Sequence, residues 1–453
     1  MPYSALTPAD RTAMLETIGI SSADELFADI PAGLREKARN AFAEMENGLS
    51  ELTIKRLFTS LAAKNTHVDS AISFLGAGLY DHYVPAAVSA IASRGEFVTA
   101  YTPYQAETSQ GTLQVIYEFQ TLVCRLTEME MANASLYDGA TGLAEALILA
   151  ATATKRKRLL LPQNLSPAYR RVAQAYLQGL PYEIVEVAYD KATGAIDSQA
   201  LQTELEAGDV AAVVLAQPNF FGVLEDAQAI SNAAHAAGAL LISVFNPLTL
   251  GVLPAPGSYD ADIAIGDGQS LGLPITYGGP GVGLFCCKQK YSRLAPGRLV
   301  GLTVDAKGNR GFTLTLQTRE QHIRREKATS NICSNQALCA LVATIYVATV
   351  GASGLREAAS QSFHKAAFAR EQLQAIPGVE LAFSGNNFHE FALKLPVPVA
   401  QVNTALQHAG ITGPYALGTD YPELKDTALF CVTEKRTREE IELLADTLRE
   451  AVK

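Results

Sequence analysis

The sequence predicts an α/β fold built on a mainly parallel sheet, with a helical arm before it and a smaller C-terminal α+β domain after it. From about residue 158 onward, short apolar segments alternate with amphipathic segments of about ten residues. That alternation is typical of parallel strands joined by helical crossovers, with helices on both faces of the sheet. The 453 residues allow a large core, and an apolar share of 48% with a charged share of 18% indicates a globular chain.

Residues 1–60 are predicted to form the helical arm. Thr7, with Asp10 three positions later, matches a helix-capping pattern, and segments 25–30 and 32–42 repeat the helical period. Such an arm has little core of its own. We expect it to pack either on the main domain or on a partner chain.

Residues 61–325 are predicted to form the large α/β domain, and residues 326–453 a long helix followed by the small domain. The predicted helices of the large domain cover 112–126, 137–151, 167–178, 197–206 and 226–237. Its predicted strands are 158–161, 182–188, 210–216, 239–245, 262–265 and 281–286. Beyond Arg319 we expect a long helical stretch, and then strands at 390–395 and 429–432.

Composition excludes several classes of function. The formal net charge of −10 argues against binding to nucleic acid or to an anionic membrane surface, because both need a basic face. The sequence has no run of eighteen apolar residues and no secretory signal pattern at its start, so we expect a cytoplasmic protein. Its six cysteines show no CxxC spacing, which argues against a metal site and against a disulfide framework.

The segment 259–287 resembles the part of pyridoxal phosphate (PLP) enzymes of the aspartate aminotransferase fold that carries the cofactor lysine. By that comparison a histidine falls at position 269 and the lysine at 270, but the chain has Gln269 and Ser270. A serine hydroxyl forms no Schiff base with an aldehyde. No lysine lies between Lys191 and Lys288, so a change of register supplies none.

A second part of the cofactor machinery is also missing from the sequence. In a PLP enzyme an aspartate pairs with the pyridine nitrogen, and by spacing it falls at about Ser243. No carboxylate occurs from Gly238 through Tyr259. The chain therefore looks like a PLP enzyme that lacks its nucleophile.

The loop 101–111 is a candidate site because it places aromatic, amide and carboxylate groups just ahead of a helix. Loops of this kind on a rigid scaffold often carry function. The alternative is an ordinary helix start, with Ser109 as the N-cap and the tyrosines in the core. The candidate residues are Tyr101, Thr102, Tyr104, Gln105 and Glu107.

Two further segments are candidates for contact with an anion or substrate. A glycine-bearing turn opens a helix at 137–151, and the amides of Gly139, Ala140, Thr141 and Gly142 could cradle an anion there. The alternative for this turn is tight packing against the sheet. A cationic cluster precedes a Ser/Asn-rich helix start, and its alternatives are a solvated basic face or an inter-subunit salt bridge. The candidates are Asn133, Asp138, Thr141, Arg324, Arg325 and Lys327.

Several long motifs together resemble one family. FLGAGLYDHYVP, YTPYQAETSQGTLQ, ANASLYDGATGLAEA, DIAIGDGQSLG and RREKATSNICSNQAL are similar to the N-terminal half of the glycine cleavage system P-protein. In many bacteria that enzyme is split, and this chain resembles the α chain, called subunit 1, over essentially its whole length. Asp267, where a glutamate is usual, and Ser270, where a proline is common, depart from the pattern.

The resemblance implies a type I PLP fold with a seven-stranded sheet and an α₂β₂ assembly. It implies that the β chain holds PLP through its lysine, and that this chain binds none covalently and is inactive alone. It also implies the reaction: glycine loses CO₂, and its aminomethyl group passes to the lipoyl group of the H-protein. The loop residues Tyr101 to Glu107 would then contribute to the active site of the partner.

Two other functions stay open at this point. One is a purely structural or regulatory scaffold subunit, in which the loop would be far from the partner's site. The other is an independent enzyme that uses PLP or pyridoxamine phosphate without a lysine. That enzyme would show the absorbance of the cofactor without any partner.

Overall fold

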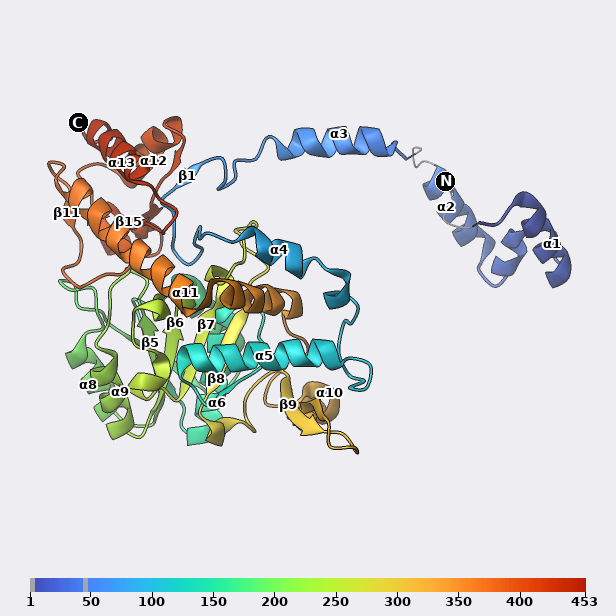
Figure 1. Ribbon diagram of the computed structural model, residues 1–453, viewed down its shortest axis with the longest axis horizontal. Coiled ribbons are helices and arrows are strands. Elements are labelled where there is room, and N and C mark those ends of the chain that lie inside the picture. Colours follow the sequence, from blue (N-terminus) through green and yellow to red (C-terminus); the bar gives the residue numbers. More distant parts are fainter. Residues whose placement is uncertain (1–4, 44–47) are drawn as a thin grey trace. The chain divides into compact units, whose positions relative to one another are not determined.

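The structure is a computed structural model that describes residues 5–43 and 48–453. The chain divides into two compact units, Met1–Thr66 and His67–Lys453. The predicted boundary near 325 does not separate two units in this division, so a domain boundary there stays a prediction. Figure 1 shows the elements of both units.

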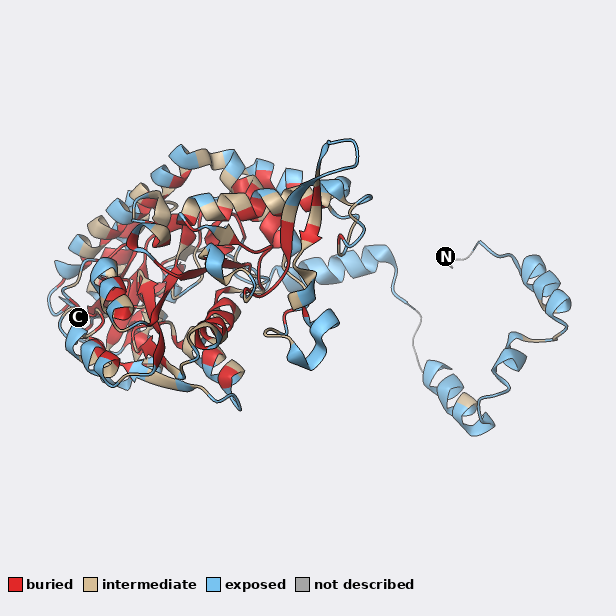
Figure 2. Ribbon diagram, turned by 90° about the horizontal axis from the view of Figure 1, so that it is seen from below, coloured by how far each residue is buried: buried red, intermediate tan, exposed pale blue. Residues whose placement is uncertain are grey.

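The first unit is helical, as its sequence predicted. It contains α1 (Pro8–Ile18), a short 3₁₀ turn η1 (Ala23–Phe27), α2 (Ala32–Ala43) and α3 (Glu51–Ala62). The capping box at the start of α1 is present, because Thr7 and Asp10 each bond the other's backbone amide. None of the three α-helices has a buried residue, and Figure 2 shows them almost entirely in pale blue. What this arm packs on stays a prediction.

The second unit is organised around a seven-stranded sheet with the order β2-β8-β7-β6-β5-β3-β4. The pairs among β3 to β7 are parallel, whereas β8 is antiparallel to β7 and β2 is antiparallel to β8. The prediction of a mainly parallel sheet is confirmed, and β2 is a strand that the sequence did not indicate. The strands are β2 (Met131–Ala132), β3 (Arg158–Pro162), β4 (Glu183–Val187), β5 (Val210–Gln217), β6 (Leu240–Phe245), β7 (Ile263–Asp267) and β8 (Gly283–Cys287).

Helices cover both faces of this sheet, which is why its strands are apolar almost throughout. On β5, Val213 and Leu215 pack with one core cluster, and Ala212 and Val214 pack with the other. The first cluster also holds side chains of α5, α8, α9 and α11, and the second holds side chains of α6 and α7. The helices are α4 (Ala86–Ala92), α5 (Gln110–Thr127), α6 (Gly139–Thr154), α7 (Pro167–Leu177), α8 (Ser198–Glu206) and α9 (Ala227–Ala236).

The C-terminal part is α+β, as predicted. Its sheet has the order β11-β12-β15-β14 and shares one apolar core with α12, α13 and the end of α11. The elements are α11 (Ala337–Gln374), β11 (Glu380–Leu381), β12 (Glu390–Lys394), α12 (Val399–His408), β13 (Ile411–Thr412), β14 (Tyr415–Ala416), β15 (Thr427–Cys431) and α13 (Arg438–Ala451). The short strand β1 (Ile72–Ser73) pairs with β13.

The helix α11 differs from its prediction at its start. The helical stretch expected from Arg319 begins only at Ala337, after two short turns, α10 (Gln321–Arg324) and η8 (Arg325–Lys327). Residues 328–336 are not helical because the Asn335 amide donates to the Ala134 carbonyl at 2.9 Å, and the Gln336 backbone bonds Ser135 Oγ at 3.1 Å. A hairpin, β9 (Leu299–Val304) with β10 (Arg310–Thr315), precedes these turns and was not predicted.

α11 is also long and apolar enough to match a membrane span by length and composition. Its apolar side chains instead pack in the fold: Tyr346 and Leu355 belong to the core under the large sheet, and Leu373 belongs to the core of the small domain. The helix changes direction at Gly351, which has a φ of 62°. α11 therefore joins the two cores of the second unit.

Candidate functional site

A cavity of about 130 Å³ lies where β5, β6 and β7 end. In open α/β sheets, ligands bind outside the carboxyl ends of the parallel strands, so this is the position where the fold forms its site. The polar groups that line the cavity include Tyr80, Tyr169, Asn246, Asp267, Ser270 and Glu390. The sequence indicated only the Ser270 side of this cavity.

Ser270 follows β7 in a short 3₁₀ turn, η5 (Gly268–Ser270). Its side chain is 2% exposed, and its hydroxyl donates to Oδ1 of Asn246 at 3.1 Å. Ser243 is buried on β6, where its hydroxyl lies 2.7 Å from the hydroxyl of Tyr259. Both serines are thus engaged with neutral partners, and neither position offers an amine or a carboxylate.

Gln269 holds a strap of chain, residues 76–83, against the large domain. The Tyr80 amide donates to Oε1 of Gln269 at 3.0 Å, and Nε2 of Gln269 donates to the Tyr80 carbonyl at 3.0 Å. The same Nε2 donates to the carbonyl of Leu273 at 2.9 Å. The residue next to the missing lysine therefore has a structural role, which is to fix the strap.

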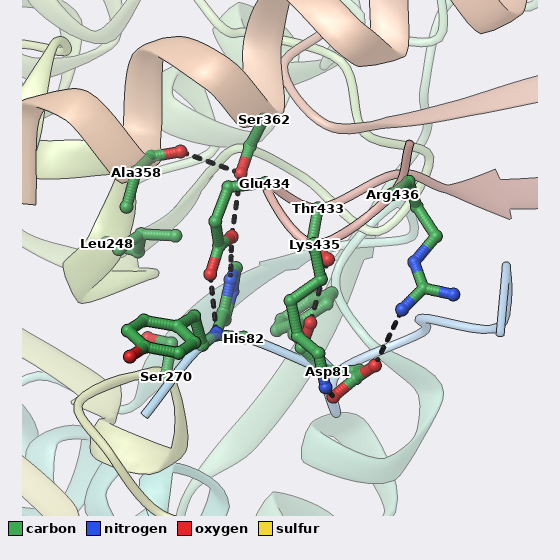
Figure 3. A network of polar contacts seen from close by, with 12 residues as sticks. Asp81, His82, Leu248, Ser270, Ala358, Ser362, Thr433, Glu434, Lys435 and Arg436 are labelled. Atoms are coloured by element: carbon green, nitrogen blue, oxygen red, sulfur yellow. Dashed lines mark hydrogen bonds and ion pairs between the residues drawn. The ribbon is translucent and has the colours of Figure 1, made fainter. Parts of the chain in front are cut away.

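The other side of the strap is tied to the small domain, as Figure 3 shows. Asp81 forms ion pairs with Lys435 at 2.6 Å and with Arg436 at 3.0 Å. Nδ1 of His82 lies 2.7 Å from Glu434, which also accepts from Ser362 on α11 at 3.2 Å. The strap thus connects the two cores on either side of the cavity.

Glu390 of β12 faces the cavity beneath this strap. Its carboxyl group accepts from the Ala77 amide at 2.6 Å and from the Tyr80 hydroxyl at 2.8 Å. Burial raises the pKa of Glu390 to about 7 and lowers the pKa of the neighbouring His389 to about 3. His389 is therefore a neutral imidazole, and neither of its ring nitrogens has a hydrogen-bond partner in the described part of the chain.

The start of α6 differs from the predicted anion cradle. The Gly139 amide donates to Oδ2 of Asp267 at 3.2 Å, and the Thr141 amide donates to Oδ1 of Asp138 at 2.8 Å. Asp138 is the N-cap of α6, and burial raises the pKa of Asp267 to about 6. The expectation of free amides at Gly139 and Thr141 is wrong, because the chain's own carboxylates bind them. The alternative prediction, a turn packed against the sheet, describes this segment better.

The residues of the cavity do not fit PLP. No lysine lines it, Ser243 stands where an aspartate would pair with the pyridine nitrogen, and the amides at the start of α6 are taken. A phosphate at that helix terminus would meet the carboxyl group of Asp267. The chemistry of PLP therefore has no support from these residues.

The loop 101–107 lies outside this cavity and is open to solvent. Tyr101 is 93% exposed and Tyr104 is 54% exposed, so they are not core tyrosines. Ser109 makes no side-chain cap bond to α5, so the alternative of an ordinary capped helix start is wrong. Thr102 is half-buried, whereas Gln105 and Glu107 are exposed.

The structure brings this loop close to the cationic segment. The ring of Tyr104 packs edge-on to His322 of α10 with the centroids 6.1 Å apart, and the guanidinium of Arg298 lies 5.7 Å from its centre. The predicted cluster of Arg324, Arg325 and Lys327 begins two residues after this histidine. All three cations are exposed and form no ion pair with any residue in 5–43 or 48–453.

The remaining candidate, Asn133, is buried and has a structural role. Its Nδ2 donates to the Pro296 carbonyl at 3.0 Å, and its Oδ1 accepts from the Ser135 amide at 3.1 Å. It therefore braces the turn ahead of α6. Among the described residues, no group of three or more His, Cys, Asp and Glu side chains could hold a metal ion.

Comparison with known proteins places the chain in a family. Residues 2–448 match the family model of the glycine cleavage system P-protein. The chain belongs to the glycine cleavage system P-protein family. It is 50% identical, over 99% of each chain, to a protein of Desulforamulus reducens named probable glycine dehydrogenase (decarboxylating) subunit 1.

Solved structures of this family and of more distant proteins have the same fold. A crystal structure of glycine decarboxylase (P-protein) in inhibitor-bound form superposes with a TM-score of 0.89, at 42% identity and over 100% of both chains. A sphingosine-1-phosphate lyase of Burkholderia pseudomallei K96243 superposes with a TM-score of 0.65 at 17% identity, over 90% of this chain and 91% of that one. The predicted type I fold of PLP-dependent enzymes is confirmed.

Proposed function

We propose that this chain is a subunit of glycine dehydrogenase (decarboxylating) in the glycine cleavage system and that it is inactive by itself. Its membership of the P-protein family supports the reaction. The single observation that supports its role as the non-catalytic subunit is Ser270 at the lysine position, with Gln269 committed to the strap. The partner subunit, the β chain of an α₂β₂ complex, would supply the lysine that binds PLP.

The complex would decarboxylate glycine and pass the aminomethyl group to the lipoylated H-protein. PLP would supply the electron sink for this reaction from the β chain. This chain needs no membrane or nucleic acid for that role, and its acidic charge is compatible with a cytoplasmic protein.

The chain's own contribution to the reaction would come from the loop 101–107. Tyr101, Thr102, Tyr104, Gln105 and Glu107 lie outside the chain's own cavity, and four of the five are exposed, so they are free to meet a partner. We propose that these residues close the active site of the β chain and bind or orient glycine there. The exposed cations Arg324, Arg325 and Lys327 stand close enough along the chain to add charge for a carboxylate at the same place.

The test is to assay the chain, the β chain and their complex for release of CO₂ from glycine. Activity only in the complex is expected, and decarboxylation by this chain alone would show an enzyme that works without a lysine. In the complex, Tyr104→Phe and Gln105→Ala should each lower turnover by about tenfold, which corresponds to about 1.4 kcal/mol. PLP absorbance of the complex should stay unchanged.

The matched control is Gln202→Ala on α8, an exposed glutamine whose only described side-chain bond is to Glu206 on the same helix. It should leave turnover unchanged. If the loop variants also leave turnover unchanged, the chain is a scaffold subunit, and its loop does not take part in the reaction.

A further inference from the structure

The cavity beside Ser270 has an excess of negative charge. Two carboxyl groups, those of Asp267 and Glu390, line it, and no lysine, arginine or histidine does. Neither carboxyl group forms an ion pair with any residue that the structure describes. Glu390 is 4% exposed, so solvent does not replace the missing cation.

The neighbours of these carboxyl groups are neutral hydrogen-bond donors. Glu390 accepts from Ala77 and Tyr80, and Asp267 accepts from the Gly139 amide and, at 2.9 Å, from the Gln269 amide. Burial outweighs these bonds, because the pKa of Asp267 is raised to about 6 and that of Glu390 to about 7. Two carboxyl groups that ionise near neutral pH thus face one cavity without a counter-ion.

A second, independent observation is a buried hydrogen-bond donor in the cavity that has no acceptor. Asn246 lines the cavity, and its Nδ2 is buried with no acceptor in the described part of the chain, while its Oδ1 accepts from Ser270. Tyr169 belongs to the same lining. An unpaired buried amide costs free energy, so it indicates an acceptor that is not part of this chain.

We propose that this cavity binds a small molecule that carries a primary ammonium group and a hydrogen-bond acceptor. Glu390 and Asp267 bind the ammonium group, and Nδ2 of Asn246 donates to the acceptor. Two aromatic residues, Phe220 and Tyr169, also belong to the lining.

The volume of the cavity suits a small ligand. About 130 Å³ holds a molecule of roughly four or five non-hydrogen atoms, since one water takes about 30 Å³ of liquid volume. An amino alcohol such as ethanolamine and an amino acid such as glycine both have this size and the required groups. They differ in charge, because the carboxylate of glycine would lie near the two carboxyl groups of the cavity.

The experiment is titration calorimetry on the full chain alone, at pH 7.5, with four probes: ethanolamine, glycine, ethylammonium and acetate. At least one of the first two should bind, ethylammonium should bind at least tenfold more weakly, and acetate should not bind. Absence of binding by both ethanolamine and glycine would overturn the proposal. Acetate binding as strongly as the ammonium compounds would overturn it too.

Variants separate the two parts of the site. Glu390→Gln and Asp267→Asn should each weaken binding by at least tenfold. Asn246→Ala should weaken the binding of ethanolamine or glycine to the affinity of ethylammonium. It should leave the affinity for ethylammonium unchanged. The control is Glu206→Gln, which removes an exposed carboxylate of α8 and should change nothing.

Because Glu390→Gln could loosen the strap, a second measurement uses the unaltered chain. Glu390, with its pKa raised to about 7, is still partly protonated at pH 7.5. An ammonium group that binds there releases protons, so the heat of binding should vary with the ionisation enthalpy of the buffer. Binding without proton release would contradict the assigned carboxyl groups. Since no partner and no decarboxylation are needed, these results are independent of the proposed function.

Discussion

Three buried carboxyl groups stand out among the single residues. Burial raises the pKa of Glu145 on α6 to about 7, that of Glu390 to about 7 and that of Asp267 to about 6. In the unfolded chain a glutamate titrates at about 4.3. Between about pH 4.3 and 7 such a glutamate therefore binds more protons in the folded chain than in the unfolded chain, and its contribution to stability falls as the pH rises through that window.

Glu145→Gln tests this effect away from the cavity. The variant keeps the shape of the side chain but loses the charge that burial opposes. Relative to the parent chain, its free energy of unfolding should rise between pH 5 and pH 8 by about 1–3 kcal/mol, since one pKa unit corresponds to about 1.4 kcal/mol. Urea unfolding at the two pH values measures the difference.

The exposed Glu206→Gln is the matched control and should show the same free-energy difference from the parent at both pH values. A Glu145→Gln variant that loses stability equally at pH 5 and pH 8 would contradict the raised pKa.

Among single residues, the sequence predicted the absence of the cofactor lysine and aspartate better than it predicted the groups that line the cavity. Ser270 and Ser243 follow from the resemblance to PLP enzymes and from spacing, because Ser243 lies on β6 and Ser270 lies in the turn that follows β7. The resemblance placed Asp267 in the degenerate pocket, but the sequence assigned neither its partners nor Glu390. The partners are far away in sequence: Gly139 is 128 positions from Asp267, and Ala77 is 313 positions from Glu390. An acid inside the apolar segment 390–395 was the one available signal of a buried site.

Among the elements, the strap 76–83 depends on one side chain of the large domain. Gln269→Ala removes the bonds to both backbone groups of Tyr80. It leaves the Tyr80 amide without a partner, whereas the Tyr80 carbonyl still accepts from the His82 amide at 3.1 Å. The free energy of unfolding should fall by about 1–3 kcal/mol, the cost of unsatisfied buried polar groups. Hydrogen exchange at the Tyr80 amide should be faster than in the parent chain.

Gln202→Ala on the surface of α8 is the control for the loss of a glutamine. It should change neither the free energy of unfolding nor the hydrogen exchange of the Tyr80 amide. Unchanged exchange at Tyr80 in Gln269→Ala would mean that the small domain alone holds the strap.

The direction change in α11 depends on a single backbone conformation. Gly351 has a φ of 62° and a ψ of −175°, which residues with a Cβ rarely adopt, and no atom lies within 4 Å of an added Cβ. Gly351→Ala should therefore destabilise the chain through its backbone alone, by about 1–3 kcal/mol in thermal or urea unfolding. Gly33→Ala in α2, where the glycine has no positive φ, should be neutral or stabilising.

Apolar runs predicted the strands and helices of the large domain because burial on both faces leaves a clear pattern. β2 and the hairpin of β9 and β10 have no such pattern. The start of α11 was predicted too early because Asn335 and Gln336, just before it, bond to the turn before α6 and do not continue a helix. A sequence window contains no record of such tertiary contacts.

For the whole molecule, the two units differ in how they are stabilised. Among the described residues, none of the five clusters of buried apolar side chains includes a residue before Ile72. A chain that begins at His67 should therefore unfold cooperatively, and its melting temperature should lie within about 3 °C of that of the full chain. A change of this size is smaller than the shift that about 1 kcal/mol causes in a small domain. Scanning calorimetry would show this.

If the melting temperature of the shortened chain falls by more than about 3 °C, the arm stabilises the second unit. Equal melting temperatures with impaired assembly of the complex would instead support the expectation that the arm packs on a partner.

The amide of Gly139, bonded to Asp267, has a consequence for the history of this chain. A lysine introduced at position 270 would enter a cavity in which Asp267 already occupies the Gly139 amide, where a phosphate would bind. It would also lie next to Gln269, which holds the strap. Several substitutions would have to revert together before any one of them gave an advantage. A chain with these contacts would therefore need several coupled substitutions, and not one, before its cavity could bind a cofactor.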